Sequence, residues 1–421
     1  MKHFLKLWIG ELISNIGSGM TSFALSAYIY EKTGRVSYVS LIMLLAYVPN
    51  IILSPVGGIL ADRYDRRILM IIGDFLSGLG IAYIFWNIQT GNESLFPIFI
   101  GIGFSSVFTA VLEPSYKATV TDVLPKREYD RASGLVQMAE NAKYLIAPAL
   151  AGFILSMTDI RVILLFDIMT FIITCFIIVS VKKYIGRTDS CSGDNFIYLM
   201  KEGISVIIRN KGIYFLVNIM FFVCFFIGMV QVLLRPLILS LSSIKTAGIM
   251  ESVCAFGMLG GSLRISFKGI RKKYAEILSV AGILCGIFMS ASGISTNLLI
   301  IGIFTFLFFM TLPFMNTCAD VLVRISVPDN LQGRIWGIIS FLTQAGSVTA
   351  FLISGILADY VFEPMFSDNG ILSDNIGMLI GIGKGRGTGF LLVLSGLGMI
   401  AMSVIIGKNK EIKVIENKKT G

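Results

Sequence analysis

Long apolar runs alternate along the chain with short polar segments rich in Lys and Arg. A helix that crosses the roughly 30 Å hydrocarbon core of a bilayer needs about 20 consecutive apolar residues, and each run reaches that length. The pattern predicts an all-α membrane protein. Its twelve transmembrane helices are expected at 7–29, 38–61, 68–88, 95–121, 132–156, 160–181, 211–240, 246–267, 275–294, 297–323, 334–358 and 388–407.

The distribution of Lys and Arg predicts how these helices are oriented. If the N-terminus lies in the cytoplasm, 25 of these residues fall in cytoplasmic segments and 6 in external turns. Cytoplasmic loops of membrane proteins carry such an excess of Lys and Arg. We therefore expect a multi-pass protein of a bacterial cell (plasma) membrane with both termini in the cytoplasm.

The segment 182–210 is the longest polar stretch on the predicted cytoplasmic side and separates two sets of six predicted helices. An internal repeat supports this division, because one offset of 203 residues relates Gly57 to Gly260 and Gly152 to Gly355. Parallel repeats of this kind occur in transporters whose substrate site lies between them near the membrane midplane. We expect two pseudo-symmetric six-helix bundles: residues 1–181, a cytoplasmic linker at 182–210, and residues 211–421 with a cytoplasmic tail.

Composition excludes several other classes of protein. Of the 421 residues, 55% are hydrophobic and 14% are charged, whereas a soluble domain has about 25% charged residues. The net charge of +9 reflects the cytoplasmic Lys and Arg and does not indicate a nucleic-acid partner. His3 is the only histidine, the six cysteines lack metal-ligand spacing, and no nucleophile–base pair is evident. We expect no metal site, no cofactor and no enzymatic activity.

The most distinctive polar segment, 58–67, connects the second and third predicted helices and reads GILADRYDRR. Gly58 permits a close approach between helices, and Asp62 can neutralise the N-terminus of a neighbouring helix. Arg63, Arg66 and Arg67 can pair with carboxylates at the cytoplasmic rim. These residues are candidates for a conformational latch; the alternative is a basic loop that only fixes the topology.

The segment 58–67 resembles the signature loop of the major facilitator superfamily. Asp65 stands where many members have Gly, a variant of the macrolide-efflux-like branch of drug:proton antiporters. Residues 8–17 resemble the opening helix of that family, and residues 114–134 resemble its fourth span and the loop that follows. The resemblance covers nearly the whole chain and implies a carrier that alternates between inward-open and outward-open states.

Residues 143–152 resemble the antiporter signature of the fifth span, with Ala147 and Ala151 in place of two glycines. The resemblance implies close helix packing at Ala147, Pro148 and Gly152, as in exporters; the alternative is a helix that is merely kinked. One feature departs from the family. Proton-coupled members often carry an Arg in the fourth span, whereas Ser105 lies near that position here.

Charged residues inside the predicted spans are the remaining candidates for function, because such residues usually face the bundle interior and have partners. Glu113 and Lys117 are four residues apart, and Glu140 and Lys143 are three apart, so each pair shares one face of its helix. The candidates for substrate binding or ion coupling are Glu11, Glu113, Lys117, Glu140, Lys143 and Asp167. The alternative is that they form structural ion pairs, with Glu11 balancing Lys6. Asp74 and Arg235 are expected near span ends, where long side chains reach water.

The sequence therefore predicts a secondary active transporter that acts as a monomer in the lipid bilayer. By resemblance, its small-molecule substrate is a hydrophobic or amphipathic, macrolide-like drug, and export is driven by protons or another coupling ion. One alternative is export of a siderophore, a peptide or another endogenous metabolite. A second alternative is a membrane sensor that does not transport.

Overall fold

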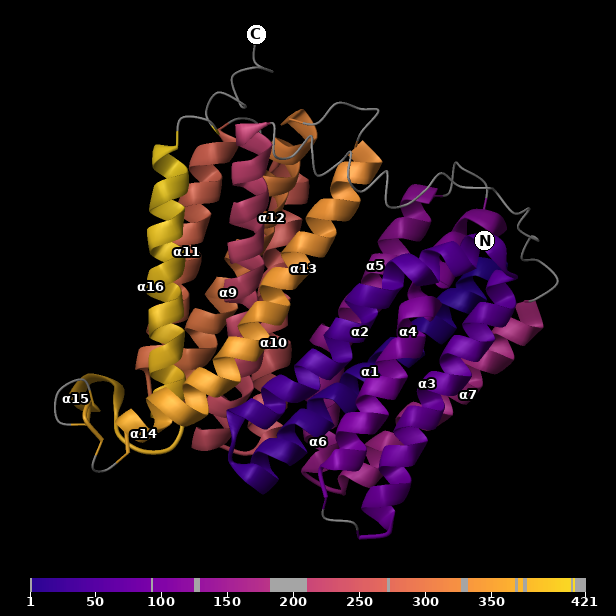
Figure 1. Cartoon of the computed structure of the whole chain (residues 1–421), viewed down its shortest axis with the longest axis horizontal. Helices are drawn as coiled ribbons and strands as arrows, with labels where there is room; N and C mark the ends of the chain where they lie inside the picture. Colours follow the sequence, from indigo (N-terminus) through magenta and orange to yellow (C-terminus); the bar gives the residue numbers. More distant parts are fainter. Residues whose placement is uncertain are drawn as a thin grey trace. The chain divides into compact units, whose positions relative to one another are not determined.

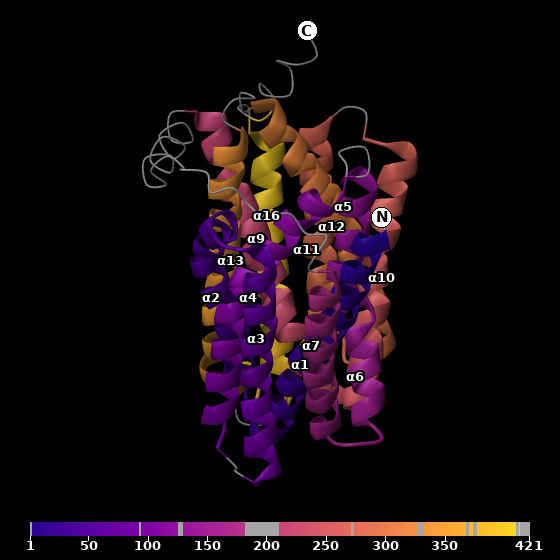
Figure 2. The ribbon, with the colours of Figure 1, turned by 90° about the vertical axis from the view of Figure 1, so that its right-hand side faces the viewer.

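The computed structural model describes residues 2–91, 94–124, 129–181, 210–270, 273–326, 332–367, 370–373, 377–409 and 412. Over these residues the chain is built from helices (Figures 1 and 2). They are α1 (Lys2–Thr33), α2 (Val36–Arg63), α3 (Arg66–Gln89), α4 (Phe96–Val123), α5 (Tyr129–Leu145), α6 (Ala147–Leu155), α7 (Ile160–Val181), α9 (Lys211–Leu241), α10 (Ile244–Lys268), α11 (Tyr274–Ile294), α12 (Leu298–Ser326), α13 (Gln332–Leu357), the π-helical turn η4 (Ala358–Phe362), α14 (Glu363–Met365), α15 (Gly377–Ile380) and α16 (Arg386–Lys408).

The helix bounds follow the predicted spans closely. Ten of the described helices are long and apolar enough to cross a membrane. The other two predicted spans correspond to α1 and to the pair α5 and α6. The predicted linker 182–210 lies outside the described residues, except for Asn210. The Asn210 side chain accepts hydrogen bonds from the backbone N–H groups of Gly212 and Ile213, so it caps the start of α9.

The predicted fifth span is a broken helix rather than a continuous one. α5 ends at Leu145 and α6 begins at Ala147, with Ile146 between them at φ −105° and ψ −43°. Pro148 has no N–H group, so it cannot donate the helical hydrogen bond to the carbonyl of Tyr144. The break therefore has a local covalent cause.

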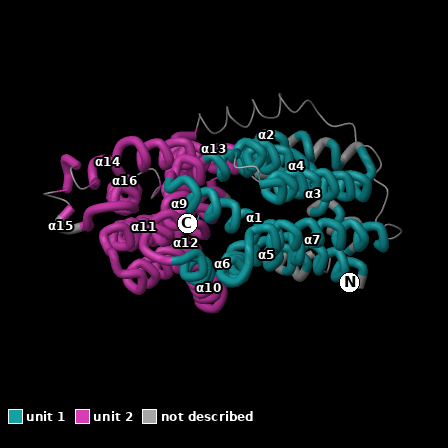
Figure 3. The backbone as a smooth tube through the Cα atoms, turned by 90° about the horizontal axis from the view of Figure 1, so that it is seen from below, with its two compact units in different colours: residues 1–34, 41–192, 243–252 teal, residues 35–40, 193–242, 253–421 magenta. Residues whose placement is uncertain are grey.

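The described chain forms two compact units (Figure 3). Unit 1 contains residues 1–34, 41–192 and 243–252, and unit 2 contains residues 35–40, 193–242 and 253–421. In unit 1, α3 packs against both α4 and α7. One buried cluster at this junction combines Leu7 of α1, Met70 of α3, Leu112 and Tyr116 of α4, and Ile178 and Val181 of α7.

Glycines let α3 and α4 approach each other closely. A Cβ atom added to Gly80 would lie 2.6 Å from the carbonyl oxygen of Gly101, and one added to Gly101 would lie 2.7 Å from that of Gly80. The hydroxyl groups of Ser77 and Ser105 are 2.5 Å apart across the same contact. Ser105, which stands near the position of the family's Arg, thus joins two helices of unit 1.

In unit 2, polar side chains hold the connection between α13 and α16. The Glu363 carboxylate accepts hydrogen bonds from the backbone N–H groups of Gly385 and Thr388 and from the Thr388 hydroxyl, at 3.1, 3.0 and 2.8 Å. Arg386 is 2% exposed and donates to the carbonyl oxygens of Ser295 and Ile380. The start of α16 is therefore fixed by bonds to chain segments that precede it.

Two charged residues lie deeper than predicted. Asp74 and Arg235 were expected to reach water near span ends, but their exposed fractions are 1% and 9%. For Asp74 the reason is helix packing, because α4 and α7 cover the corresponding part of α3. The expectation that these two side chains reach water easily is wrong.

The Gly80–Gly101 contact predicts a difference between two glycines of α4. We expect Gly101→Ala to destabilise the protein by about 1–3 kcal/mol, because the new methyl group overlaps backbone atoms of α3 that cannot move aside. Gly103→Ala is the matched control, since its Cβ would meet Leu45 at an ordinary 3.7 Å. Unfolding of the purified protein in detergent measures both; equal stability of the two variants would contradict the packing argument.

Candidate functional site

Four charged side chains gather inside unit 1. They come from three helices: Glu11 from α1, Glu113 from α4, and Glu140 and Lys143 from α5. The charge of Glu11 interacts with those of Glu113, Glu140 and Lys143, and Lys143 also interacts with both other carboxylates. All four side chains are half-buried. We call these four residues the charged cluster; it contains three carboxyl groups and one ammonium group.

Helix geometry explains how the cluster forms. Glu140 and Lys143 are three residues apart on α5, so they share one helix face, and α5 packs against α1 and α4. Asn15, one turn after Glu11 on α1, donates from Nδ2 to Glu11 Oε1 at 3.1 Å and fixes that carboxylate. The sequence places each group on its helix, and helix packing brings the groups together.

Two tyrosines extend the charged cluster with aromatic surface. Lys143 Nζ lies 5.2 Å from the centre of the Tyr144 ring, within the range of a cation–π contact. The Tyr144 hydroxyl is 3.2 Å from that of Tyr47 on α2. Tyr144 is exposed. Carboxylates, an ammonium group and phenol rings together suit a ligand that has a polar or cationic group on an apolar body.

Lys117 and Asp167 are the two charged candidates that the charged cluster does not include. The Lys117 side chain lies outside the described residues. Asp167 of α7 is 1% exposed, and its Oδ1 atom lies 3.4 Å from the hydroxyl of Ser18 on α1 and from that of Thr170. Asp167 therefore lies at the contact of α1 with α7 and is not among the groups whose charges act on Glu11.

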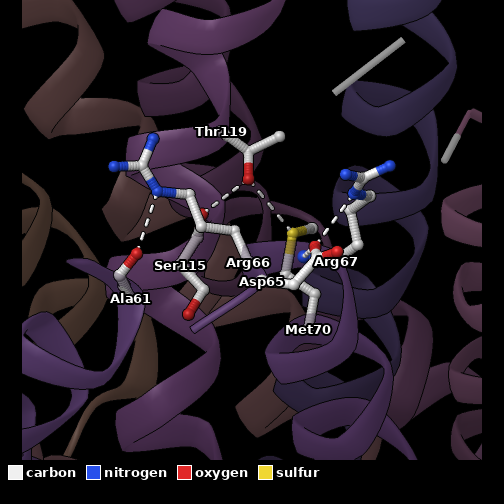
Figure 4. A network of polar contacts seen from close by, with 7 residues as sticks. All are labelled: Ala61, Asp65, Arg66, Arg67, Met70, Ser115 and Thr119. Carbon is white, nitrogen blue, oxygen red and sulfur yellow. Dashed lines mark hydrogen bonds and ion pairs between the residues drawn. The ribbon is translucent and has the colours of Figure 1, made fainter. Parts of the chain in front are cut away.

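The signature segment forms a tight turn between α2 and α3 (Figure 4). The Asp65 side chain caps α3 by accepting from the Arg67 backbone N–H at 3.0 Å, and it pairs with Arg67 Nε at 2.8 Å. Arg66 Nε donates to the Ala61 carbonyl oxygen at 3.1 Å, near the end of α2. Asp65, which stands where many members of the family have Gly, is thus the N-terminal cap of α3. The side chains of Asp62 and Arg63, and the surroundings of Gly58, lie outside the described part of the structure.

Small residues surround the start of α6. The Ala149 N–H donates to Ser252 Oγ of α10 at 3.0 Å. A Cβ atom added to Gly152 would lie 2.9 Å from the Ile244 carbonyl oxygen, and one added to Gly19 of α1 would lie 2.7 Å from the Ala147 Cβ. The Pro148 carbonyl oxygen lies against Gly248. These are close backbone approaches of the kind that small residues permit.

Sequence reasoning missed Asp359. Its Oδ1 and Oδ2 atoms accept hydrogen bonds from the backbone N–H groups of Val36 and Ser37, at 2.9 and 2.7 Å. Asp359 follows the end of α13, whereas Val36 and Ser37 begin α2, so one helix end caps the start of another; all three residues belong to unit 2. A signal was present, because 355–359 reads GILAD, the same pentapeptide as 58–62.

Comparison with known proteins gives one family. Residues 7–351 match the profile of the Major Facilitator Superfamily. Macrolide efflux protein A of Streptococcus pyogenes is 25% identical over 373 residues, which cover 85% of this chain and 90% of that protein. The protein of the same name from Enterococcus faecalis is 24% identical over 310 residues, 70% of this chain and 93% of that protein.

Solved structures of transporters are similar in fold. The nucleoside transporter NupG has a TM-score of 0.72 at 13% identity, covering 97% of this chain and 100% of that chain. An inward-facing bacterial homologue of the iron transporter ferroportin has a TM-score of 0.71 at 12% identity, covering 97% and 99%. At this identity the likeness concerns the fold alone.

The Asp359 contact predicts a stability effect. We expect Asp359→Ala to destabilise the protein by about 0.5–2 kcal/mol, because two backbone N–H groups at the start of α2 lose their acceptors. Asp359→Asn keeps one carbonyl oxygen and should fall between Ala and the wild type. Unfolding of the purified variants measures the order; an alanine variant as stable as the wild type would show that this cap contributes nothing.

Proposed function

Because the chain belongs to the Major Facilitator Superfamily, we propose that it exports hydrophobic or amphipathic, macrolide-like compounds from the cytoplasm. The predicted family and all-α membrane fold are confirmed by the profile match and the structural neighbours. The chain is thus a membrane transporter of small molecules and not an enzyme. The proposal concerns its cargo, the direction of transport, the coupling ion and the mechanism.

The charged cluster is the observation that carries this proposal. Charges inside a membrane bundle are costly, so they are retained mainly where they bind a substrate or an ion. Three carboxylates beside one ammonium group leave a negative excess that suits a cationic group on the cargo. Tyr47 and Tyr144 add aromatic surface for its apolar body. The likeness to macrolide efflux protein A over most of both chains supports the class of cargo.

The mechanism we propose is alternating access powered by an ion gradient. Glu11, Glu113, Glu140 and Lys143 bind the cargo's polar group or exchange the coupling ion. The segment 58–67 acts as a latch that holds one state and releases it. Asp359 supports this role by analogy, since the carboxylate of the second GILAD pentapeptide accepts two bonds at a helix start. We propose that Asp62 makes the same kind of bond, with Arg63, Arg66 and Arg67 contributing charge.

The proposal includes a topology and an assembly state. The carrier works as a monomer in a bacterial plasma membrane, with both termini and the linker 182–210 on the cytoplasmic side. Residues 1–181 and 211–421 act as the two halves of the transport cycle. The small residues Ala147, Pro148 and Gly152 keep α6 close to its neighbours during that cycle.

Export can be tested in cells that express the protein, with a radiolabelled macrolide as the probe. Wild-type cells should accumulate several-fold less label than cells without the protein, and a protonophore should abolish the difference. Glu140→Gln should lose most of the export, because it removes one carboxylate of the charged cluster. If the wild type leaves macrolide levels unchanged and its deletion instead causes retention of an endogenous metabolite, the cargo assignment is wrong.

The latch has a separate test. We expect Asp62→Asn to slow macrolide export about tenfold, while the amount of protein in the membrane is unchanged. A tenfold effect corresponds to a loss of roughly 1.4 kcal/mol of the free energy with which the latch stabilises one state of the cycle. Asp159→Asn is the matched control, since Asp159 is exposed and its described contacts are with nearby Arg161 and the backbone N–H of Ile160. Initial rates per amount of inserted protein give the comparison; a normal rate for Asp62→Asn would defeat the latch.

A further inference from the structure

Asp74 is a buried carboxyl group that the charged cluster does not include. Its exposed fraction is 1%, and neither of its carboxyl oxygens has a hydrogen-bond partner among the described residues. An ionised carboxylate in such a place is costly unless it is paired or binds a cation. Helix packing explains why Asp74 is buried, but it does not explain why a carboxyl group without a described hydrogen-bond partner lies there.

The neighbours of Asp74 on α3 show where it points. Ile71, Asp74 and Gly78 are spaced by three and four residues, so they share one face of the helix. The carbonyl oxygen of Ile71 is 3.9 Å from Cys175 Sγ on α7. A Cβ atom added to Gly78 would lie 3.3 Å from Phe171, also on α7. Asp74 lies between these two contacts, on the face that α3 turns toward α7.

Helix directions place Glu11 and Asp74 in the same part of unit 1. On α1, Gly10 meets Ile177 and Gly17 meets Thr170, so α1 runs opposite to α7. The pairs Ile71–Cys175 and Gly78–Phe171 show that α3 also runs opposite to α7. α1 and α3 therefore run in the same direction.

Leu7 and Met70 belong to one buried cluster. Glu11 and Asp74 each follow these residues by four positions, about one helical turn. The two residues consequently lie on neighbouring turns of α1 and α3, and the charge of Glu11 acts on Asp74.

Helices α1, α4 and α7 carry further polar groups in this part of unit 1. α7 contributes Cys175, whose thiol interacts with the Asp74 charge, and Asp167. α4 contributes Tyr116, which is 4% exposed and whose hydroxyl has no hydrogen-bond partner among the described residues. α1 contributes Glu11. Among the described residues, the charges that act on Asp74 are those of Glu11 and Asp167, both carboxylates.

We propose that Glu11 and Asp74 together bind the coupling proton of this transporter, with Asp74 as the buried member of the pair. Two carboxyl groups whose charges act on one another favour sharing one proton, because both cannot ionise without repulsion. Glu11 is half-buried and belongs to the charged cluster, whereas Asp74 is 1% exposed and does not. The proposed site thus has one member inside the cluster and one buried member outside it.

The proposed step is a proton transfer. A hydronium ion gives its proton to a carboxylate oxygen of Glu11 and becomes water. The O–H bond on Glu11 then breaks as one on Asp74 forms, so Glu11 is again an anion and Asp74 is neutral. When the proton returns by the same route and leaves, Asp74 is again an anion, and the pair has gained one negative charge that attracts a cationic cargo. This coupling rests on the proposed export function, and it requires no group other than water and the two carboxyls.

The test separates coupling from cargo binding in proteoliposomes that contain the purified full-length protein and a radiolabelled macrolide. Exchange of labelled for unlabelled macrolide at equal pH needs no net proton movement, whereas accumulation driven by a pH gradient does. For Asp74→Asn we expect exchange within about twofold of the wild type and at least tenfold less gradient-driven accumulation. Asp74→Glu should restore much of the accumulation.

Glu276→Gln is the control for neutralising a carboxylate, because Glu276 is exposed and forms an ion pair with nearby Lys273. Both activities should be unchanged in it. The proposal is overturned if Asp74→Asn retains gradient-driven accumulation, if it loses exchange and accumulation together while remaining folded, or if a sodium gradient drives the wild type in place of a pH gradient.

A second measurement does not depend on cargo. The infrared spectrum of the purified wild type should contain the carbonyl band of a protonated buried carboxyl group, and Asp74→Asn should lack it. If the wild type moves no macrolide, the proposed function fails, but this band still decides the proton site. A spectrum that is identical in the two proteins would overturn the site by itself.

Discussion

The rest of this structure depends on the cost of leaving a polar group unpaired in an apolar membrane bundle. A carboxylate or a backbone N–H group in such surroundings must find its partner within the protein. Many polar contacts described here therefore join different helices: Ser77 to Ser105, Ser252 to Ala149, and Asp359 to the start of α2. Packing by glycine and serine brings the backbones close enough for these bonds, so apolar packing and polar satisfaction act together.

The positions of the helices could be predicted from the sequence, because length and hydrophobicity alone determine which segments can span a bilayer. The break at Ile146 was harder to predict, since many membrane helices tolerate a proline such as Pro148 without ending. Which charged side chains are buried was harder still to predict. Asp74 and Arg235 are near the ends of apolar runs, but whether a side chain there reaches water depends on which helices cover it.

The candidate site shows the same limit. Spacing predicted that Glu140 and Lys143 share a face of one helix, but no local pattern predicts that Glu11 and Glu113 lie beside them, because this depends on how α1, α4 and α5 pack. Asp359 is an instructive contrast. Its pentapeptide repeats that of 58–62, a comparison that needs only the sequence, yet its partners Val36 and Ser37 are more than 300 residues away.

The arrangement of carboxyl groups in unit 1 follows a gradient of enclosure. Glu113 and Glu140 are half-buried beside Lys143, whose ammonium group offsets part of their charge. Glu11 is half-buried as well, but it interacts both with that ammonium group and with Asp74. Among the described residues, the charges that act on Asp74 are those of carboxyl groups. A proton that moves from the cluster toward Asp74 therefore passes from a carboxylate beside an ammonium group to one whose described charged neighbours are carboxyl groups, where a neutral carboxyl group is favoured. This difference in surroundings gives the pair a direction, since the enclosed member holds the proton that its neighbour exchanges.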